Sequence, residues 1–112
     1  MKRDPLKGEP LTQVVAQRHF QAVGGDGARR EVVVSIGQPR SDPRFRGDWS
    51  CVHQISGLGD EVTRTVVGID AIQALMLTFR MVAITLRHIQ ATQGLRITWL
   101  DEEDLGLPMP GP

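Results

Sequence analysis

Hydrophobic and polar residues alternate over much of the first two thirds of the chain, which is the pattern of β-strands that bury one face. The alternating segments come in two pairs, each joined by a glycine-rich stretch: 11–23 and 31–36 flank the turn at 24–27, and 49–55 and 62–67 flank the turn at 57–60. Clusters of glycine and aspartate favour tight turns between antiparallel strands. The sequence therefore predicts two β-hairpins.

A helical period replaces this alternation after the second hairpin. Asp70 is a favourable N-cap, and Gln73 stands at the capping-box position three residues later. Gly94 supplies the left-handed residue that commonly ends a helix. We expect a helix from Asp70 to about residue 93 and a last strand over 95–100. The predicted fold class is α+β, with an antiparallel sheet of about five strands (order ββββαβ) packed on one long C-terminal helix. The residues expected in the core are Ile36, Trp49, Ile55, Phe79 and Leu86.

The predicted helix carries two apolar faces. The broader face is expected to pack on the sheet and contains Ile72, Leu75, Met76, Phe79, Val82, Ala83 and Leu86. The second set, which we call the self-association stripe, lies on the other side of the helix and consists of Leu77, Met81, Ile84 and His88. A helix with its back in water should not carry a second apolar stripe. We expect a two-fold homodimer to cover it; the chain's own tail or first hairpin, or a different protein, are the alternatives.

The length of 112 residues fits one domain, with ends that differ from the middle in composition. We expect a flexible N-terminal arm over 1–10, a single α+β domain over 11–100, and an acidic, proline-rich tail over 101–112 that frays. The lone Cys51 cannot form an internal disulfide, and no apolar segment follows the basic start of the chain, so we expect a cytoplasmic protein. Two arginines and a histidine interrupt the longest apolar stretch, which argues against a membrane span.

Charge and aromatic content argue against nucleic acid as a partner. The chain has 13 basic and 13 acidic residues, and its net charge is zero. It contains three Phe, two Trp and no Tyr, which is too few for a platform on which bases stack.

Residues capable of catalysis or metal binding do not gather at recognisable spacings. Cys51 and His53 share one strand face and could supply two zinc ligands, or a nucleophile and its base. No further ligands stand at zinc-site spacing, so we expect a buried thiol and a hydrogen-bonded histidine beside Trp49, with no catalytic residue, metal or cofactor. The alternative is a pocket between sheet and helix near His53 and Trp49, which would make the protein a small-ligand binder or a minor enzyme.

The segment before the second hairpin, residues 38–47, contains two prolines and is expected to be a loop. It places Arg40, Arg44 and Arg46 within seven positions, close to Trp49. Guanidinium groups beside aromatic rings can bind phosphate, carboxylate or an acidic protein face. We expect an exposed, mobile arginine loop that binds an anionic partner, with a plain solvated loop as the alternative.

Several segments resemble an uncharacterised family of small bacterial proteins. They are GQP at 37–39, DWSC at 48–51, ISGLG at 55–59, GIDAIQAL at 68–75, LRITWL at 95–100 and DLG at 104–106. The resemblance implies a bacterial cytoplasmic origin but no activity, cofactor or catalytic residue. The self-association stripe, the arginine loop and the missing catalytic constellation favour a non-enzymatic protein-interaction module. Within that class, a small immunity or antitoxin-like protein is conceivable by analogy of fold class and size alone.

Overall fold

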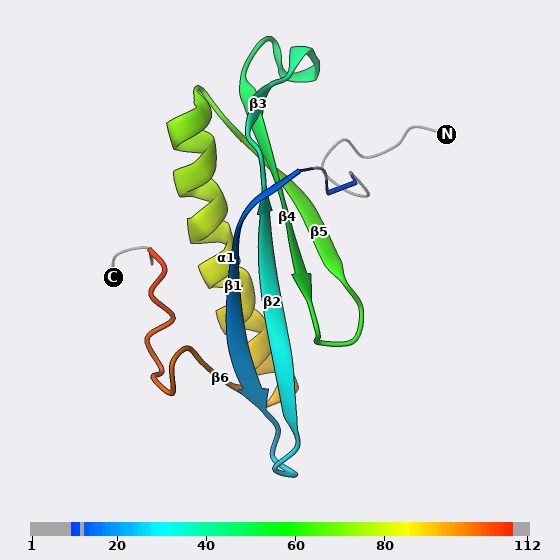
Figure 1. Cartoon of the computed structure of the whole chain (residues 1–112), viewed down its shortest axis with the longest axis vertical. Coiled ribbons are helices and arrows are strands. Elements are labelled where there is room, and N and C mark those ends of the chain that lie inside the picture. The colour runs from blue at the N-terminus through cyan, green and yellow to red at the C-terminus, as the bar shows by residue number, and fades with distance from the viewer. Residues whose placement is uncertain (1–9, 12, 109–112) are drawn as a thin grey trace.

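The structure is a computed structural model that describes residues 10–11 and 13–108 (Figure 1). Within these residues the chain forms six strands, one short 3-10 helix and one α-helix: β1 (Val14–Val23), β2 (Arg29–Gly37), β3 (Arg40–Ser41), η1 (Pro43–Phe45), β4 (Trp49–Ser56), β5 (Val62–Gly68), α1 (Ala71–Gln93) and β6 (Arg96–Thr98). Nearly all of the expected N-terminal arm, and the last four residues of the expected tail, lie outside the described residues.

The strands form one antiparallel sheet. β1 pairs with β2 on one side and with β6 on the other. β2 and β3 pair with successive stretches of one edge of β4, while β5 pairs with the other edge. The α+β fold with an antiparallel sheet and one long helix is therefore confirmed. The sixth strand was not expected, because β3 lies in the segment predicted to be entirely loop.

The ends of α1 follow the local sequence signals. The Asp70 carboxylate accepts a hydrogen bond from the backbone N–H of Gln73 at 2.8 Å, and the Gln73 side chain accepts one from the Ile69 N–H at 2.8 Å. These contacts satisfy backbone donors that a helix N-terminus leaves unpaired. At the other end, Gly94 adopts the left-handed conformation, with φ of 62°, and its N–H bonds to the Gln90 carbonyl. The predicted helix bounds are confirmed.

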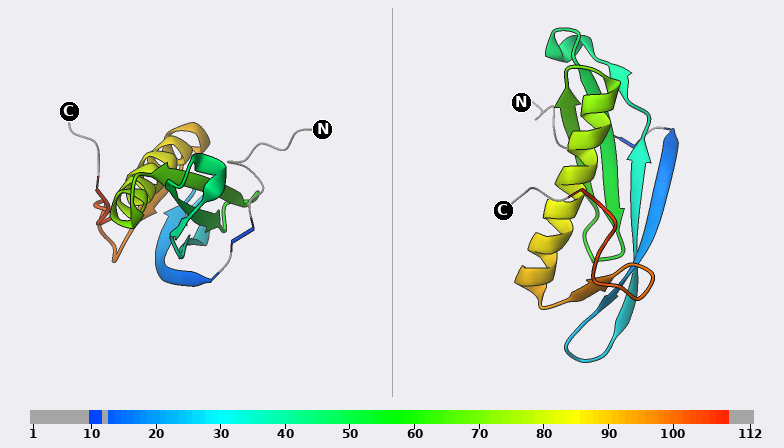
Figure 2. Two further views of the ribbon diagram at one scale, coloured as in Figure 1. Left: turned by 90° about the horizontal axis from the view of Figure 1, so that it is seen from above. Right: turned by 90° about the vertical axis from the view of Figure 1, so that its left-hand side faces the viewer.

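The sheet and α1 form two layers, with the core between them (Figure 2). α1 packs against β4, β5 and β6. Three of the five residues expected in the core are buried there, namely Ile36, Ile55 and Leu86. Trp49 and Phe79 are half-buried and pack against the border of the same cluster. The sheet thus covers one face of α1, and the two flanks of the helix beside this face are not covered by the sheet.

The helix is turned relative to the predicted core face. Ile72 and Met76, expected in the core, are 69% and 62% exposed. Ala74 and Thr78 are fully buried in their place. Thr78 enters the core because its hydroxyl donates to the Ala74 carbonyl at 2.7 Å. β5 and α1 are also close together at Gly68, where an added Cβ would lie 2.5 Å from the Ala74 backbone nitrogen. Small residues therefore form the contact in the first half of α1, while Val82, Ala83 and Leu86 of the predicted face are buried in the second half.

The described part of the tail packs on the domain, so the expectation of a frayed tail is wrong for residues 101–108. Leu105 is 3% exposed and belongs to the core cluster. Arg87 donates to the Glu103 carbonyl at 2.7 Å, which joins the tail to α1. The acidic side chains of 101–104 are exposed, as expected from their charge. Figure 2 shows the tail running beside the helix from β6.

By length and composition alone, α1 could cross a membrane, and 28% of its most apolar window is buried in the protein. The helix nevertheless packs on a sheet along one face, and it carries Arg80 and Arg87 within its length. Core helices of soluble proteins meet the same criterion. The property therefore assigns no membrane location.

Candidate functional site

The exposed members of the self-association stripe, Met81 and Ile84, do not line either of the hollows that the tail borders. The tail residues Gly106 and Leu107 line a cavity together with Phe79 and Val82, so the tail lies over the flank of α1 that carries Phe79. At 3.6 residues per turn, the stripe is centred about 170° around the helix from Phe79. Met81 and Ile84 are 42% and 41% exposed. The described part of the chain therefore leaves these two side chains open to solvent.

The other two members of the stripe differ in burial. Leu77 is half-buried, and His88 is exposed. Among the described tail residues, Pro108 lines a hollow together with Leu77, but Met81 and Ile84 remain exposed, so the tail does not cover the whole stripe. The stripe is therefore one of two exposed apolar surfaces of α1; the other contains Ile72 and Met76.

The arginine loop is organised by an aspartate. Asp42 is buried, and its carboxylate accepts hydrogen bonds from Arg44 Nε at 2.9 and 3.0 Å and from the Ser50 hydroxyl at 3.1 Å. It also accepts from the Arg44 backbone N–H at 3.0 Å. The Arg44 guanidinium, with these further donors, holds the pKa of Asp42 well below its usual range. Arg44 is thus part of the loop's own structure.

The remaining predicted residues of the loop are placed differently. Arg40 and Arg46 are exposed, and among the described residues they have no ion-pair partner. Arg46 ends η1 in the left-handed conformation, with φ of 58°. Trp49 is half-buried against the core, so it contributes to packing at the loop's base. All three arginines are exposed, but Arg44 is bonded to Asp42, so Arg40 and Arg46 are the two predicted residues whose charge is not paired within the loop.

His53 is buried without hydrogen bonds, contrary to the expectation of a satisfied histidine. Its side chain is fully buried, and neither ring nitrogen has a partner among the described residues. Burial, together with the nearby charge of Arg64, lowers its pKa to about 4. The imidazole is therefore neutral at physiological pH. Burying it without hydrogen bonds lowers the free energy of unfolding.

Cys51 lies on the same strand and is also fully buried. Its thiol is 3.4 Å from the Gly37 carbonyl, and burial raises its pKa. Both side chains are closed off from solvent, so neither the protonated thiol nor the neutral imidazole is accessible to a substrate. Within the described residues, no group of three or more His, Cys, Asp or Glu side chains is arranged to hold a metal ion.

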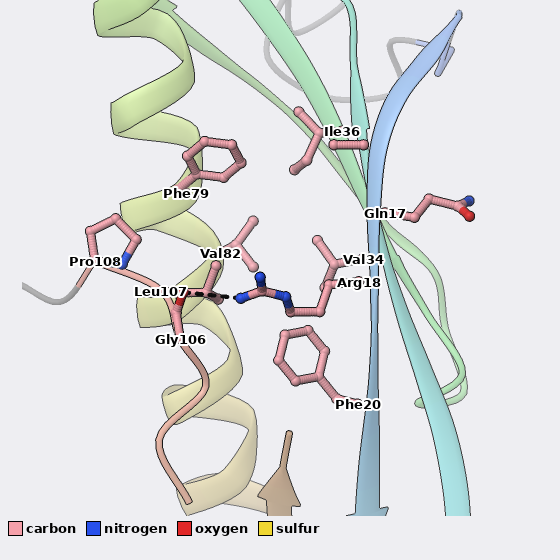
Figure 3. A pocket seen from close by; sticks show the side chains of 11 residues that line it. Gln17, Arg18, Phe20, Val34, Ile36, Phe79, Val82, Gly106, Leu107 and Pro108 are labelled. Carbon is pink, nitrogen blue, oxygen red and sulfur yellow. Dashed lines mark hydrogen bonds between the residues drawn. The ribbon is translucent and has the colours of Figure 1, made fainter. Parts of the chain in front are cut away.

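A cavity does lie between sheet and helix, but neither His53 nor Trp49 lines it. It measures about 230 Å³ and opens between β1, α1 and the tail (Figure 3). Its walls are apolar, with Phe20, Ile36 and Phe79 among them. The charged group in its lining is Arg18, whose guanidinium reaches from β1 toward the tail.

Arg18 is the residue that the sequence-based prediction missed. A signal for it exists, because Arg18 is the one charged position in the alternating series Val14, Ala16, Arg18, Phe20 and Ala22. A cation on the buried face of a strand is unusual unless it has a specific contact. The series therefore marks Arg18 as a candidate binding or anchoring residue.

Arg18 joins the tail to the domain. Its Nη1 donates to the Leu105 carbonyl at 3.1 Å and to the Gly106 carbonyl at 3.0 Å. Its guanidinium lies 3.8 Å from the centre of the Trp99 ring, a favourable cation–π distance. Gly106 has φ of +67°, and an added Cβ there would collide with the Trp99 ring. Arg18, Trp99 and Gly106 thus form one packed unit, which we call the tail anchor.

Comparison with known proteins gives a family but no activity. No curated protein and no solved structure matches this chain. One family model matches residues 16–109, and its description is a domain of unknown function (DUF6968). The match runs from β1 to the end of the described tail and includes the arginine loop, α1 and the tail anchor. The chain therefore belongs to the DUF6968 family, for which no function is established.

Proposed function

We propose that this protein is a non-enzymatic protein-interaction module of the bacterial cytoplasm that forms a two-fold homodimer through the self-association stripe. The observation that carries the proposal is the exposure of Met81 and Ile84, at 42% and 41%. Burying such side chains contributes roughly 1.5–3 kcal/mol each. A second copy would bury both residues on both subunits.

The spacing of the stripe suits a second copy of the same helix. The four members lie at intervals of four, three and four residues, so their order reads the same in both directions. When two such helices pack antiparallel about an axis between Met81 and Ile84, Met81 of one copy faces Ile84 of the other. Leu77 then faces His88 of the other copy. A two-fold interface requires this kind of self-complementary surface.

The charges of α1 are compatible with this pairing. The helix contains no Asp or Glu, and its two arginines are Arg80 and Arg87. In the same register, Arg80 stands opposite Thr85 of the second copy, where no like charge opposes it. Arg87 is bonded to the tail on the other flank. The pairing therefore places no pair of like charges in direct opposition.

Size-exclusion chromatography with light scattering tests the homodimer. We expect wild-type protein to elute as a dimer, and Ile84→Glu to raise the dimer dissociation constant at least about a hundredfold, because two carboxylates would enter the apolar contact. The matched control is Ile72→Glu, since Ile72 is exposed at 69% on another flank of α1. The control should remain dimeric. A wild-type monomer at every concentration, or equal effects of the two variants, would contradict the proposal.

A further, acidic protein partner is proposed at Arg40 and Arg46. The supporting observation is that both guanidinium groups are exposed on a loop whose backbone is fixed by Asp42. Purified wild type can be compared with the Arg40→Ala/Arg46→Ala variant in pull-downs from the native host. We expect salt-sensitive capture of acidic proteins that the double variant loses and an Arg30→Ala control retains. Equal capture by all three proteins would reject this partner site.

A further inference from the structure

The cavity beside Arg18 combines an apolar interior with one positive charge. Its lining comes from the inner face of β1 and β2, from α1 and from the tail. Gln17 contributes its position on β1, but its side chain points away from the cavity (Figure 3). It bonds instead to Ser35 on the other face of the sheet. Arg18 is thus the group that gives the cavity its electrostatic character.

The cavity contains no acidic side chain in its lining. Arg18 uses Nη1 for the two tail carbonyls, and among the described residues its other guanidinium N–H groups have no hydrogen-bond acceptor. A guanidinium presents five donors in a planar fork that matches a carboxylate. The positive charge near apolar walls is therefore matched by a ligand with an anionic head and an apolar body.

We propose that this cavity binds a small monocarboxylate with a short apolar chain or ring. The carboxylate pairs with the unused donors of Arg18, and the apolar body lies against Phe20, Val34 and Phe79. The volume of about 230 Å³ is below the usual range for drug-sized ligands, which restricts the ligand to a short chain or a single ring. This site is separate from the self-association stripe, because no residue of the stripe lines the cavity.

The tail forms part of the binding site. Gly106, Leu107 and Pro108 close one side of the cavity, and the same guanidinium that would bind the ligand holds the Gly106 carbonyl. A ligand carboxylate near Arg18 therefore contacts the group that anchors the tail. Ligand binding and tail docking share one residue, so the tail amides report on occupancy.

Sodium octanoate is a suitable probe, with octanamide as its uncharged counterpart. We expect saturable octanoate binding by calorimetry, and NMR shifts concentrated at Val34, Phe79 and Gly106. Octanamide should bind at least about tenfold more weakly, because a charge-assisted hydrogen bond contributes more than a neutral one. Equal affinity for the acid and the amide, or shifts spread over other surfaces, would overturn the proposal.

Variants separate the charge from the cavity. Arg18→Met should weaken octanoate binding at least about tenfold, while Arg30→Met, a matched control at an exposed arginine outside the cavity lining, should leave it unchanged. Ala16→Trp fills the mouth of the cavity from an exposed position without altering Arg18, and it should abolish binding. If Arg18→Met fails to fold, Ala16→Trp decides the question.

Wild-type affinity in Ala16→Trp would overturn the site. Octanoate should bind equally well to the Ile84→Glu variant used for the homodimer, so the two proposals can fail independently.

Discussion

At the scale of single residues, His53 carries the clearest consequence for stability. Its folded-state pKa of about 4 lies below the usual value of 6.5, so between these pH values the unfolded chain binds a proton that the folded protein does not. The free energy of unfolding is then unaffected above pH 6.5 and falls as the pH drops through this window. The total loss is on the order of 3 kcal/mol.

Replacing His53 by leucine should remove this sensitivity. At pH 7 we expect His53→Leu to match or exceed wild-type stability by about 1 kcal/mol, because a buried polar group without hydrogen bonds is replaced by an apolar one of similar size. Urea unfolding at pH 7 and pH 5 measures both effects. His19→Gln, at an exposed histidine paired with Glu31, is the control and should keep the wild-type slope. A variant that loses stability between pH 7 and 5 as steeply as wild type would disprove the assignment.

The sequence locates some of these residues better than it describes their surroundings. Alternation placed Cys51 and His53 on one face, and the strand β4 confirms this because residues two apart in a strand share a face. It could not show that His53 lacks hydrogen bonds, since that depends on which side chains α1 and β5 bring near it. Arg44 was predicted as a surface charge, but its bond to Asp42 requires the local turn of η1 that the composition does not specify.

At the scale of elements, the tail anchor accounts for the docking of residues 101–108. We predict that Gly106→Ala undocks the tail, because a left-handed alanine costs about 1–2 kcal/mol and its Cβ would also strike the Trp99 ring. In the wild type the Gly106 N–H donates to the Asp104 carboxylate at 2.8 Å. In the variant, the amide at position 106 should exchange with solvent faster than in the wild type. Hydrogen exchange and thermal unfolding measure the two effects.

Gly94→Ala is the matched control for this variant. Gly94 has a similar φ of +62°, but an added Cβ meets nothing within 4 Å. It should lose stability only through its backbone conformation and leave the exchange of the tail amides unchanged. If both variants lose equal stability and neither alters the tail, the contact between Gly106 and Trp99 has no role in docking.

The orientation of α1 shows where prediction at the element scale reaches its limit. Capping residues specified both ends of the helix correctly. Val82, Ala83 and Leu86 of the predicted core face are fully buried, whereas in the first half of the helix the contact uses Ala74, which lies against Gly68, and Thr78 in place of Ile72 and Met76. Close approach of two backbones favours small residues, and a hydroxyl bonded within its own helix can be buried. A pattern that counts only large apolar residues cannot register either effect.

At the scale of the whole molecule, the fold class follows from local signals that agree with one another. Glycine-rich turns, alternating strands and a capped helix each specify their own segment, and together they indicate an antiparallel sheet packed on one helix. The docking of the tail did not follow in the same way, because its residues are acidic and proline-rich. The position of the tail depends on Arg18, which is distant from it in sequence, and on Trp99, which is close in sequence but contacts Gly106 only in the folded protein.

The proposed homodimer also predicts that the two α1 helices pack antiparallel. The molar mass of the dimer does not test this orientation. In an antiparallel pair, Met81 of one copy lies opposite Ile84 of the other. Residues at the same position are instead displaced along the helix by three residues, about 4.5 Å. A disulfide requires Cα atoms within about 4.4–6.8 Å, so it discriminates between these pairs. The native Cys51 is buried and does not compete.

We therefore predict that an equimolar mixture of the Met81→Cys and Ile84→Cys proteins forms a heterodimeric disulfide under mild oxidation, at a rate several-fold above that of either variant alone. Non-reducing electrophoresis and mass spectrometry identify the product. A mixture of Leu77→Cys and His88→Cys should behave in the same way, because it occupies the outer pair of the same register. Parallel packing would give the opposite result, since each single variant would then cross-link to itself more readily than to its counterpart. That outcome would reject the antiparallel interface even if the protein is a dimer.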